Sequence, residues 1–119
     1  TSVFTVLVAD DQREVLTIIS NWLRQAGHVA VCASSGREAM ALLRSMHVDA
    51  LITDLVMPNG NGLELIMDAR SERPSMRIAA ISSSEQTEAA LAAGADACLR
   101  KPLMPEVLLR ALGTPAATT

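Results

Sequence analysis

The sequence predicts a single α/β domain in which a parallel sheet is wound with helices on both faces. Two observations lead to this prediction. The chain alternates five times between a β-rich apolar run and the spacing of an amphipathic helix, and its 119 residues suit one hydrophobic core. Strand–helix units in series give a parallel sheet, because right-handed crossovers place helices on both of its faces.

The expected strands are short apolar runs without strict alternation, which is the pattern of strands buried on both faces. The first run reads "VFTVLVAD" and the second reads "HVAVCAS". In sequence order, the five strands are expected at 3–10, 28–34, 49–53, 76–82 and 96–100.

Five helices are expected after these strands, and all but the second have a glycine or proline near the end: Gly27, Pro74, Gly94 and Gly113. The third helix is expected at 62–73 and the fourth at 85–93. Methionines at helical spacing are expected to fill the core. The apolar faces of the first, second and last helices contain Val15, Ile18, Ile19, Trp22, Leu23 and Ala26, then Ala39, Met40, Leu43 and Met46, and finally Met104, Val107, Leu108, Ala111 and Leu112.

The segment 59–62 reads "NGNG", which is also a signal for a β-hairpin. The residues that follow do not alternate in polarity, and "LELIMDAR" instead has helical spacing. A helix is therefore favoured over a hairpin here. Gly60 and Gly62 are expected to provide positive φ near the start of that helix.

Composition argues against several classes of function. The formal net charge is −3, and Phe4 and Trp22 are the only aromatic residues, so neither the basic patch nor the stacking platform of a nucleic-acid-binding protein is expected. No apolar run is long enough to span a membrane, and the first residues do not resemble a signal peptide. A cytoplasmic protein is therefore expected.

Cys32 and Cys98 fit neither a metal-binding nor a disulfide pattern, and are expected to be reduced, buried side chains. The last residues, "GTPAATT", have the composition of a linker. The domain is therefore placed at 1–113 and a flexible tail or linker at 114–119. Whether the chain is a whole protein or a part of a longer one stays open.

Polar side chains gather where the predicted strands end. The first strand ends in Asp10 and Asp11, the third in Asp54, the fourth in a serine cluster that begins at Ser82, and the fifth is followed by Lys101. The carboxyl ends of strands in such a sheet form the usual ligand site. Crowded carboxylates raise one another's pKa unless a cation lies between them, and hard oxygen ligands suit Mg²⁺. A carboxylate there could attack phosphorus, while a lysine and a serine hydroxyl hold the phosphoryl oxygens.

Each of these residues also has a simpler interpretation. Asp10 and Asp11 precede a predicted helix and could cap its N-terminus. Ser82 with Glu85 has the spacing of a capping box. Lys101 alone could be a solvated surface lysine. The functional interpretation is favoured because the residues occur together at the ends of four strands.

With these motifs in view, the sequence resembles the response-regulator receiver domains of two-component signalling over roughly residues 4–112. The matching motifs are the acidic pair Asp10–Asp11, "DLVMPNGNG" at 54–62, "IS" at 81–82 and "KP" at 101–102. The resemblance implies a flavodoxin-like α/β fold with five helices and a doubly wound five-stranded parallel sheet in the order 2-1-3-4-5. In that order, a Cys32–Cys98 disulfide would contradict the fold.

The resemblance also implies roles for individual residues. Asp54 would accept a phosphoryl group from a histidine kinase or a histidine phosphotransfer protein, and Ser82 and Lys101 would hold that group. Asp11, Asp54 and the Val56 carbonyl would bind Mg²⁺, for which Mn²⁺ may substitute, and Asp10 would act mostly through water. A cis peptide is expected before Pro102. The downstream protein target stays unknown, and a homodimer formed through the last helices stays open.

Two features depart from the family pattern. Cys98 stands three residues before the lysine, where the family usually has Tyr or Phe, and the stretch from Ser82 to Lys101 is about three residues shorter than is common. These departures keep a second interpretation open, a pseudo-receiver that binds partners without a phosphorylation switch. A true phosphohydrolase is disfavoured, because such enzymes need a second acid two residues beyond the nucleophile, and Val56 stands there.

Overall fold

The computed structural model describes residues 3–57, 60–83 and 86–113. Its main sheet has five parallel strands in the order β2-β1-β3-β6-β7, which confirms the predicted fold. A separate two-stranded sheet accounts for the labels β4 and β5. The strands of the main sheet are β1 (Thr5–Ala9), β2 (Val29–Ala33), β3 (Ala50–Asp54), β6 (Arg77–Ser82) and β7 (Ala97–Arg100).

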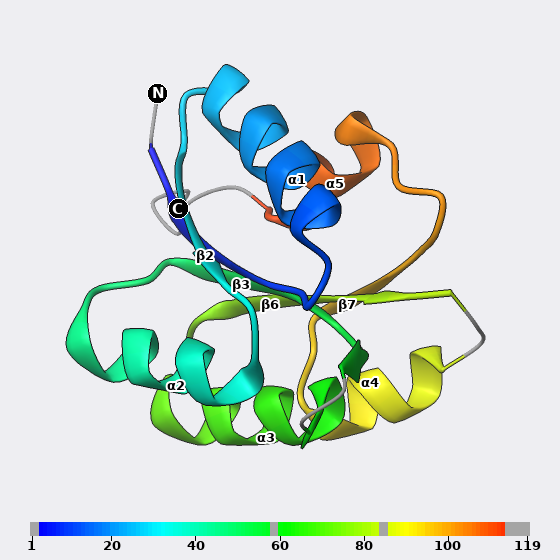
Figure 1. Cartoon of the computed structure of the whole chain (residues 1–119). Coiled ribbons are helices and arrows are strands. Elements are labelled where there is room, and N and C mark those ends of the chain that lie inside the picture. The colour runs from blue at the N-terminus through cyan, green and yellow to red at the C-terminus, as the bar shows by residue number, and fades with distance from the viewer. Residues whose placement is uncertain (1–2, 58–59, 84–85, 114–119) are drawn as a thin grey trace.

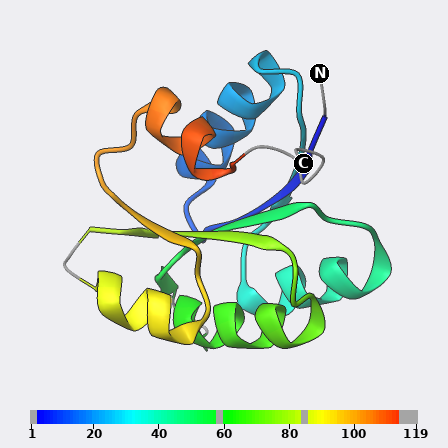
Figure 2. The same ribbon diagram turned by 180° about the vertical axis from the view of Figure 1, so that it is seen from behind.

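Five helices cover the sheet in two layers. Helices α1 and α5 lie on one face, and α2, α3 and α4 lie on the other (Figure 1). The view from behind shows the same three-layer arrangement (Figure 2). The helices are α1 (Arg13–Gln25), α2 (Gly36–Ser45), α3 (Gly62–Glu72), α4 (Thr87–Ala93) and α5 (Pro105–Ala111).

The core is divided by the sheet into two aliphatic clusters. In β1, Leu7 and Ala9 belong to the cluster under α2 and α3, whereas Val6 and Val8 belong to the cluster under α1 and α5. All four side chains are almost completely buried. A strand with helices on both faces must be apolar at every position, which explains the continuous apolar run in the sequence.

A short pair of strands precedes α3. Two short strands, β4 (Val56–Met57) and β5 (Gly60–Asn61), pair antiparallel, and α3 begins directly afterwards at Gly62. The prediction of a helix is confirmed, because "LELIMDAR" lies within α3 and does not form the second strand of a hairpin. The β4–β5 pair is a different and smaller hairpin, with two residues on each side. The expected positive φ at Gly62 is wrong, because the described glycines with positive φ are Gly27, Gly94 and Gly113.

The expected burial of both cysteines is wrong. Cys32 is exposed and Cys98 is only partly buried, and both thiols are free. Cys32 lies in β2, which has a neighbouring strand on one side only, and four of the five residues of β2 are exposed or partly exposed. Strands β2 and β7 lie at opposite edges of the sheet, which agrees with the absence of a disulfide between these two cysteines.

Two methionines expected in the core lie at the surface. Met67 in α3 is 56% exposed, and Met104, directly before α5, is 54% exposed. Met40 and Met76 are buried as expected. Residues 114–119, for which a tail was predicted, lie outside the described residues. No helix in the described part of the chain is long and apolar enough to cross a bilayer.

Candidate functional site

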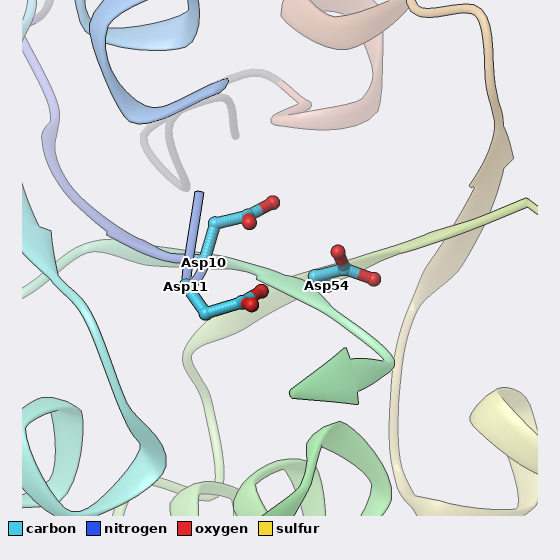
Figure 3. A group of neighbouring side chains, drawn as sticks. All are labelled: Asp10, Asp11 and Asp54. Carbon is cyan, nitrogen blue, oxygen red and sulfur yellow. The ribbon is translucent and has the colours of Figure 1, made fainter. Parts of the chain in front are cut away.

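Three carboxylates meet at the carboxyl edge of the sheet. One oxygen from each of Asp10, Asp11 and Asp54 lies within 4.8 Å of the others. Figure 3 shows Asp10 and Asp11, which follow β1, with their side chains directed toward the side on which Asp54 ends β3. Asp10 and Asp54 are buried, whereas Asp11 is exposed. The cluster is therefore a pocket with two buried carboxylates at its base and one carboxylate at its mouth.

Asp54 is the last residue of β3, whose five residues are all buried. Its carboxylate has two partners in the structure. Oδ1 accepts a hydrogen bond from the Val56 N–H at 3.1 Å, and Oδ2 forms an ion pair with Lys101 Nζ at 3.3 Å. A buried charge needs such partners, and both become available only because the strand ends at this residue.

Lys101 reaches the pocket from the loop after β7. Its backbone N–H donates to the Ser82 carbonyl at 3.0 Å, which extends the β6–β7 pairing by one residue. The peptide bond between Lys101 and Pro102 is cis, as predicted. The Lys101 side chain is 32% exposed and paired with Asp54, so the interpretation as a solvated surface lysine is wrong.

Asp10 lacks a partner for half of its carboxylate. Oδ1 accepts the Gln12 N–H at 2.9 Å, but Oδ2 is buried and has no hydrogen-bond partner among the described residues. The Asp10 pKa is raised from its ordinary value of 3.8 to about 6. Burial is the largest cause, and the nearby charges of Asp54 and Asp11 also raise it, against the lowering effects of the Gln12 N–H and Lys101. An orphaned buried oxygen beside two other carboxylates fits a bound cation.

The alternative that Asp10 and Asp11 cap α1 is not supported. The N-cap of α1 is Gln12, which makes no side-chain capping bond. The N-cap of α4 is Gln86. Glu85, the second residue of the capping box suggested for Ser82, lies outside the described residues. Asp10 and Asp11 are therefore available for a role other than helix capping.

Ser82 and Val56 lie at the same edge as the carboxylates. Ser82 is the buried last residue of β6, and it follows Ile81, the strand partner of Asp54. Val56 begins β4, and its N–H is the donor to Asp54 described above. The structure therefore brings the backbones of all the predicted site residues to one edge of the sheet.

Gly62 has a role that the sequence reasoning missed. A Cβ atom there would lie 2.7 Å from the Leu55 Cα and closer still to the Asp54 carbonyl oxygen. The Gly62 N–H donates to the Leu55 carbonyl at 3.0 Å, which holds the start of α3 against the end of β3. Glycine is needed here because two backbones approach closely, and not because of a positive φ. Local turn patterns in the sequence do not reveal such a contact.

An apolar cavity of about 350 Å³ adjoins the pocket between α1 and the loop before α5. Ile18, expected in the core, is 48% exposed beside it. Lys101 belongs both to this cavity and to the pocket. The cavity is lined by Gln12, Val15, Ile18, Ile19, Trp22, Lys101, Pro102 and Leu103.

A larger recess of about 560 Å³ opens at the opposite edge of the sheet. Its main charged groups are already paired within the fold. Arg70 forms an ion pair with Asp96 at 2.9 Å, and its guanidinium also donates to the carbonyls of Gly94, Pro74 and Met76. Among the described residues, the buried side-chain oxygen without a hydrogen-bond partner belongs to Asp10 in the acidic pocket and not to the larger recess.

Known proteins resemble this chain along most of its length. The family model described as "Response regulator receiver domain" matches residues 6–113. The response regulator SaeR of Staphylococcus aureus is 29% identical over 109 residues. That alignment covers 88% of this chain but 47% of SaeR, so the chain spans about half the length of this relative.

Two solved structures show the same likeness in three dimensions. The chemotaxis response regulator CheY4 of Vibrio cholerae is 31% identical with a TM-score of 0.86, over 93% of this chain and 97% of CheY4. A response regulator of Burkholderia pseudomallei, solved with a phosphorylated aspartic acid, calcium and citrate, is 28% identical with a TM-score of 0.87, over 96% of this chain and 69% of that one. Sequence, sheet order and pocket agree: the chain belongs to the response regulator receiver domain family of two-component systems.

Proposed function

We propose that Asp54 accepts a phosphoryl group from a histidine kinase or histidine phosphotransfer protein, and that this modification switches the interactions of the domain with an unknown downstream protein. The observation that carries the proposal is the environment of Asp54. It is a buried carboxylate paired with Lys101, beside an Asp10 oxygen that has no partner.

The carboxylates fit a divalent cation. Asp10, Asp11, Asp54 and the backbone carbonyl of Val56 would hold Mg²⁺, or Mn²⁺ in its place. The ion would supply positive charge that offsets the charge of the carboxylates and of the incoming phosphoryl oxygens. The unpartnered Asp10 Oδ2 supports this assignment, because a buried carboxylate oxygen otherwise remains desolvated at a cost.

The transfer needs few groups from the protein. A carboxylate oxygen of Asp54 attacks phosphorus, the bond from phosphorus to the donor histidine nitrogen breaks, and the electron pair of that bond stays on the imidazole, which takes up a proton. Lys101 then exchanges its pairing with the Asp54 carboxylate for pairing with the phosphoryl group. Ser82 offers a hydroxyl to a phosphoryl oxygen.

Each domain gains one aspartyl phosphate, which water later hydrolyses. The domain does not release product over many turnovers as an enzyme does. The domain is thus a stoichiometric phosphoacceptor that assists its own phosphorylation and dephosphorylation. Val56 stands where a phosphohydrolase would carry its general acid, and it cannot donate a proton. The pseudo-receiver alternative is less well supported, because all the pocket residues are present.

The cavity between α1 and the α5 loop is a suitable docking place for the phosphodonor. It is apolar, it adjoins the pocket through Lys101, and it exposes Ile18 at its rim. A donor helix that buried an apolar face there would bring its histidine to the mouth of the pocket. Apolar contact of this kind drives most protein association.

The Burkholderia pseudomallei relative, with its phosphorylated aspartic acid and calcium, supports this chemistry for the present fold. Because the chain spans about half of SaeR, the output of any longer protein that contains it is a separate question. We further propose that the domain acts in the cytoplasm without binding nucleic acid or membranes directly.

The test is incubation with Mg²⁺ and acetyl phosphate, followed by intact mass measurement. Wild type is expected to gain the mass of one phosphoryl group in the presence of Mg²⁺, and to lose it on standing after acetyl phosphate is removed. Asp54→Asn is expected to gain none, whereas Asp68→Asn, a matched change of an exposed aspartate in α3, behaves as wild type. The absence of an adduct on wild type, or an adduct that survives Asp54→Asn, contradicts the proposal. Trp22 fluorescence during beryllofluoride binding provides a second signal.

A further inference from the structure

Strand β2 is an edge strand whose outer side is open. On its inner side, the Val29 N–H donates to the Phe4 carbonyl at 2.9 Å, and the Ala33 carbonyl accepts the Asp10 N–H at 3.1 Å. The N–H and C=O of one residue in a strand point to the same side, and the side alternates along the chain. The N–H and C=O groups of Ala30 and Cys32 therefore face away from β1, along the open edge.

This edge lacks the features that usually prevent strands from pairing. Residues 25–36, "QAGHVAVCASSG", contain no Lys, Arg, Asp, Glu or Pro. Val29 is 50% exposed and Cys32 is exposed. Natural edge strands are usually protected by charge, proline or short length. Figure 1 shows β2 crossing in front of the other strands, with α1 above it and α2 below it.

The other edge of the sheet is different. Strand β7 has four residues, ends in Arg100 and is followed directly by Lys101. Charged side chains at a short edge disfavour the addition of another strand. The contrast between the two edges makes β2 the edge that is suited to pairing.

We propose that β2 is a self-association surface, on which the β2 strand of a second copy of this chain pairs antiparallel about a two-fold axis at Val31. In this register, Ala30 of each copy exchanges a pair of hydrogen bonds with Cys32 of the other. Val31 lies opposite the same residue of the other copy, and the half-exposed Val29 lies opposite Ala33 of the other copy. The two sheets join into one.

A second copy of this chain suits this edge, because residues 25–36 of each copy carry no charge or proline that would oppose the pairing. The open donors and acceptors are symmetric about Val31, so the edge is complementary to itself, as a two-fold interface requires. The side chains nearest the new ladder are small, which allows close approach from either copy. The surface lies away from the last helices and does not depend on phosphorylation at Asp54.

The test is the mass of the chain as a function of concentration, measured by sedimentation equilibrium. Wild type is expected to move from 12.6 kDa toward twice that mass as concentration rises. Ala30→Pro removes an N–H on the open side only, so the hydrogen bonds to β1 remain, and it is expected to stay at the single-chain mass. Ala30→Ser keeps the N–H and is the matched control, expected to associate as wild type does.

A second measurement on wild type removes any dependence on how Ala30→Pro folds. Amide exchange at Ala30 and Cys32 is expected to slow about tenfold when nine-tenths of the chains are paired, while exchange at Val29, whose N–H already bonds β1, stays unchanged. Wild type that keeps the single-chain mass at millimolar concentration overturns the proposal. So does a dimer that forms equally well in folded Ala30→Pro, or one that leaves exchange at Ala30 and Cys32 unchanged.

Discussion

Replacement of Gly62 by alanine tests whether the start of α3 positions the phosphoacceptor. The new Cβ would lie 2.7 Å from the Leu55 Cα and closer to the Asp54 carbonyl oxygen, whereas ordinary carbon contacts lie at about 3.5–4.0 Å. Both atoms belong to backbone, so no side chain can rotate away. Helix α3 and the end of β3 must therefore separate by roughly 1 Å to reach an ordinary contact.

The expected cost follows from two effects. Overpacking in a well-packed region costs about 1–3 kcal/mol, and weakening the hydrogen bond from the Gly62 N–H to the Leu55 carbonyl costs about 1 kcal/mol more. Gly62→Ala is thus expected to lower the free energy of unfolding by about 2–4 kcal/mol. For a domain of this size, the melting temperature falls by roughly 4 °C per kcal/mol. The displacement of Asp54 is expected to slow phosphorylation by acetyl phosphate at least about tenfold, because misplacement by roughly 1 Å can cost a hundredfold.

Gly36→Ala is the matched control. The Cβ added there meets only the Leu65 Cβ at 3.9 Å, which is an ordinary contact, and Gly36 lies in the first turn of α2 with no positive φ. This variant is expected to be as stable as wild type or slightly more stable. Urea unfolding gives the free energies, and intact mass against time gives the phosphorylation rate. If Gly62→Ala matches Gly36→Ala in both measurements, the reasoning from close backbone approach is wrong.

Three further predictions follow from the pocket and its surroundings. Because the Asp10 pKa is higher in the folded than in the unfolded chain, its protonation stabilises the wild-type fold below pH 3.8, and this stabilisation is lost as pH rises through about 6. In chelator, the free energy of unfolding of Asp10→Asn is therefore expected to rise relative to wild type by up to about 3 kcal/mol between pH 4 and pH 7.5, measured by urea unfolding. A difference between the two proteins that is the same at both pH values would contradict this. Arg70→Met breaks part-buried hydrogen bonds to the carbonyls of Met76 and Gly94 and is expected to cost about 2–4 kcal/mol. Arg44→Met, at an exposed pair with Glu72, is expected to cost less than about 1 kcal/mol, and similar urea midpoints for the two variants would count against the assigned role of Arg70. Ile18→Glu is expected to slow transfer from a phosphodonor protein but not from acetyl phosphate, and Leu91→Glu, at an exposed residue of α4, should affect neither.

The strand ends could be predicted from sequence because burial restricts them most strongly. A strand covered on both faces tolerates a carboxylate only where it stops, so "LITD" marks both the end of β3 and the position of Asp54. The same reasoning placed Asp10 at the end of β1. The parallel order then brings these ends together without any further information about side chains.

The burial of individual apolar residues could not be predicted as well. Helical spacing shows which residues share a face, but not how far neighbouring elements cover that face. Helix α5 has seven residues, and Ile18, Met104 and Val107 all remain about half exposed around α1 and α5. Cys32 shows the same limit: the order 2-1-3-4-5 places its strand at an edge of the sheet but does not show which of its residues are covered, and Cys32 is exposed whereas Ala33 is buried.

The need for Gly62 could not be read from sequence for another reason. Its close contact joins the start of α3 to the backbone of Asp54 and Leu55, and the intervening loop turns back through β4 and β5. Turn signals in "NGNG" indicate that the chain reverses, but they do not show which backbone lies across the turn.

The backbone of the pocket continues the sheet by one hydrogen bond after each of β1, β3 and β7. The Asp10 N–H bonds Ala33, the Leu55 N–H bonds Ile81, and the Lys101 N–H bonds Ser82. In each of these bonds, the donor is the first residue after one strand, and the acceptor is the last or second-to-last residue of the adjacent strand. A catalytic carboxylate and its lysine are thus held by the same ladder that stabilises the core, so the pocket can be preorganised without a ligand. Variants that weaken the ladder at these ends should therefore lose phosphorylation before they lose the fold.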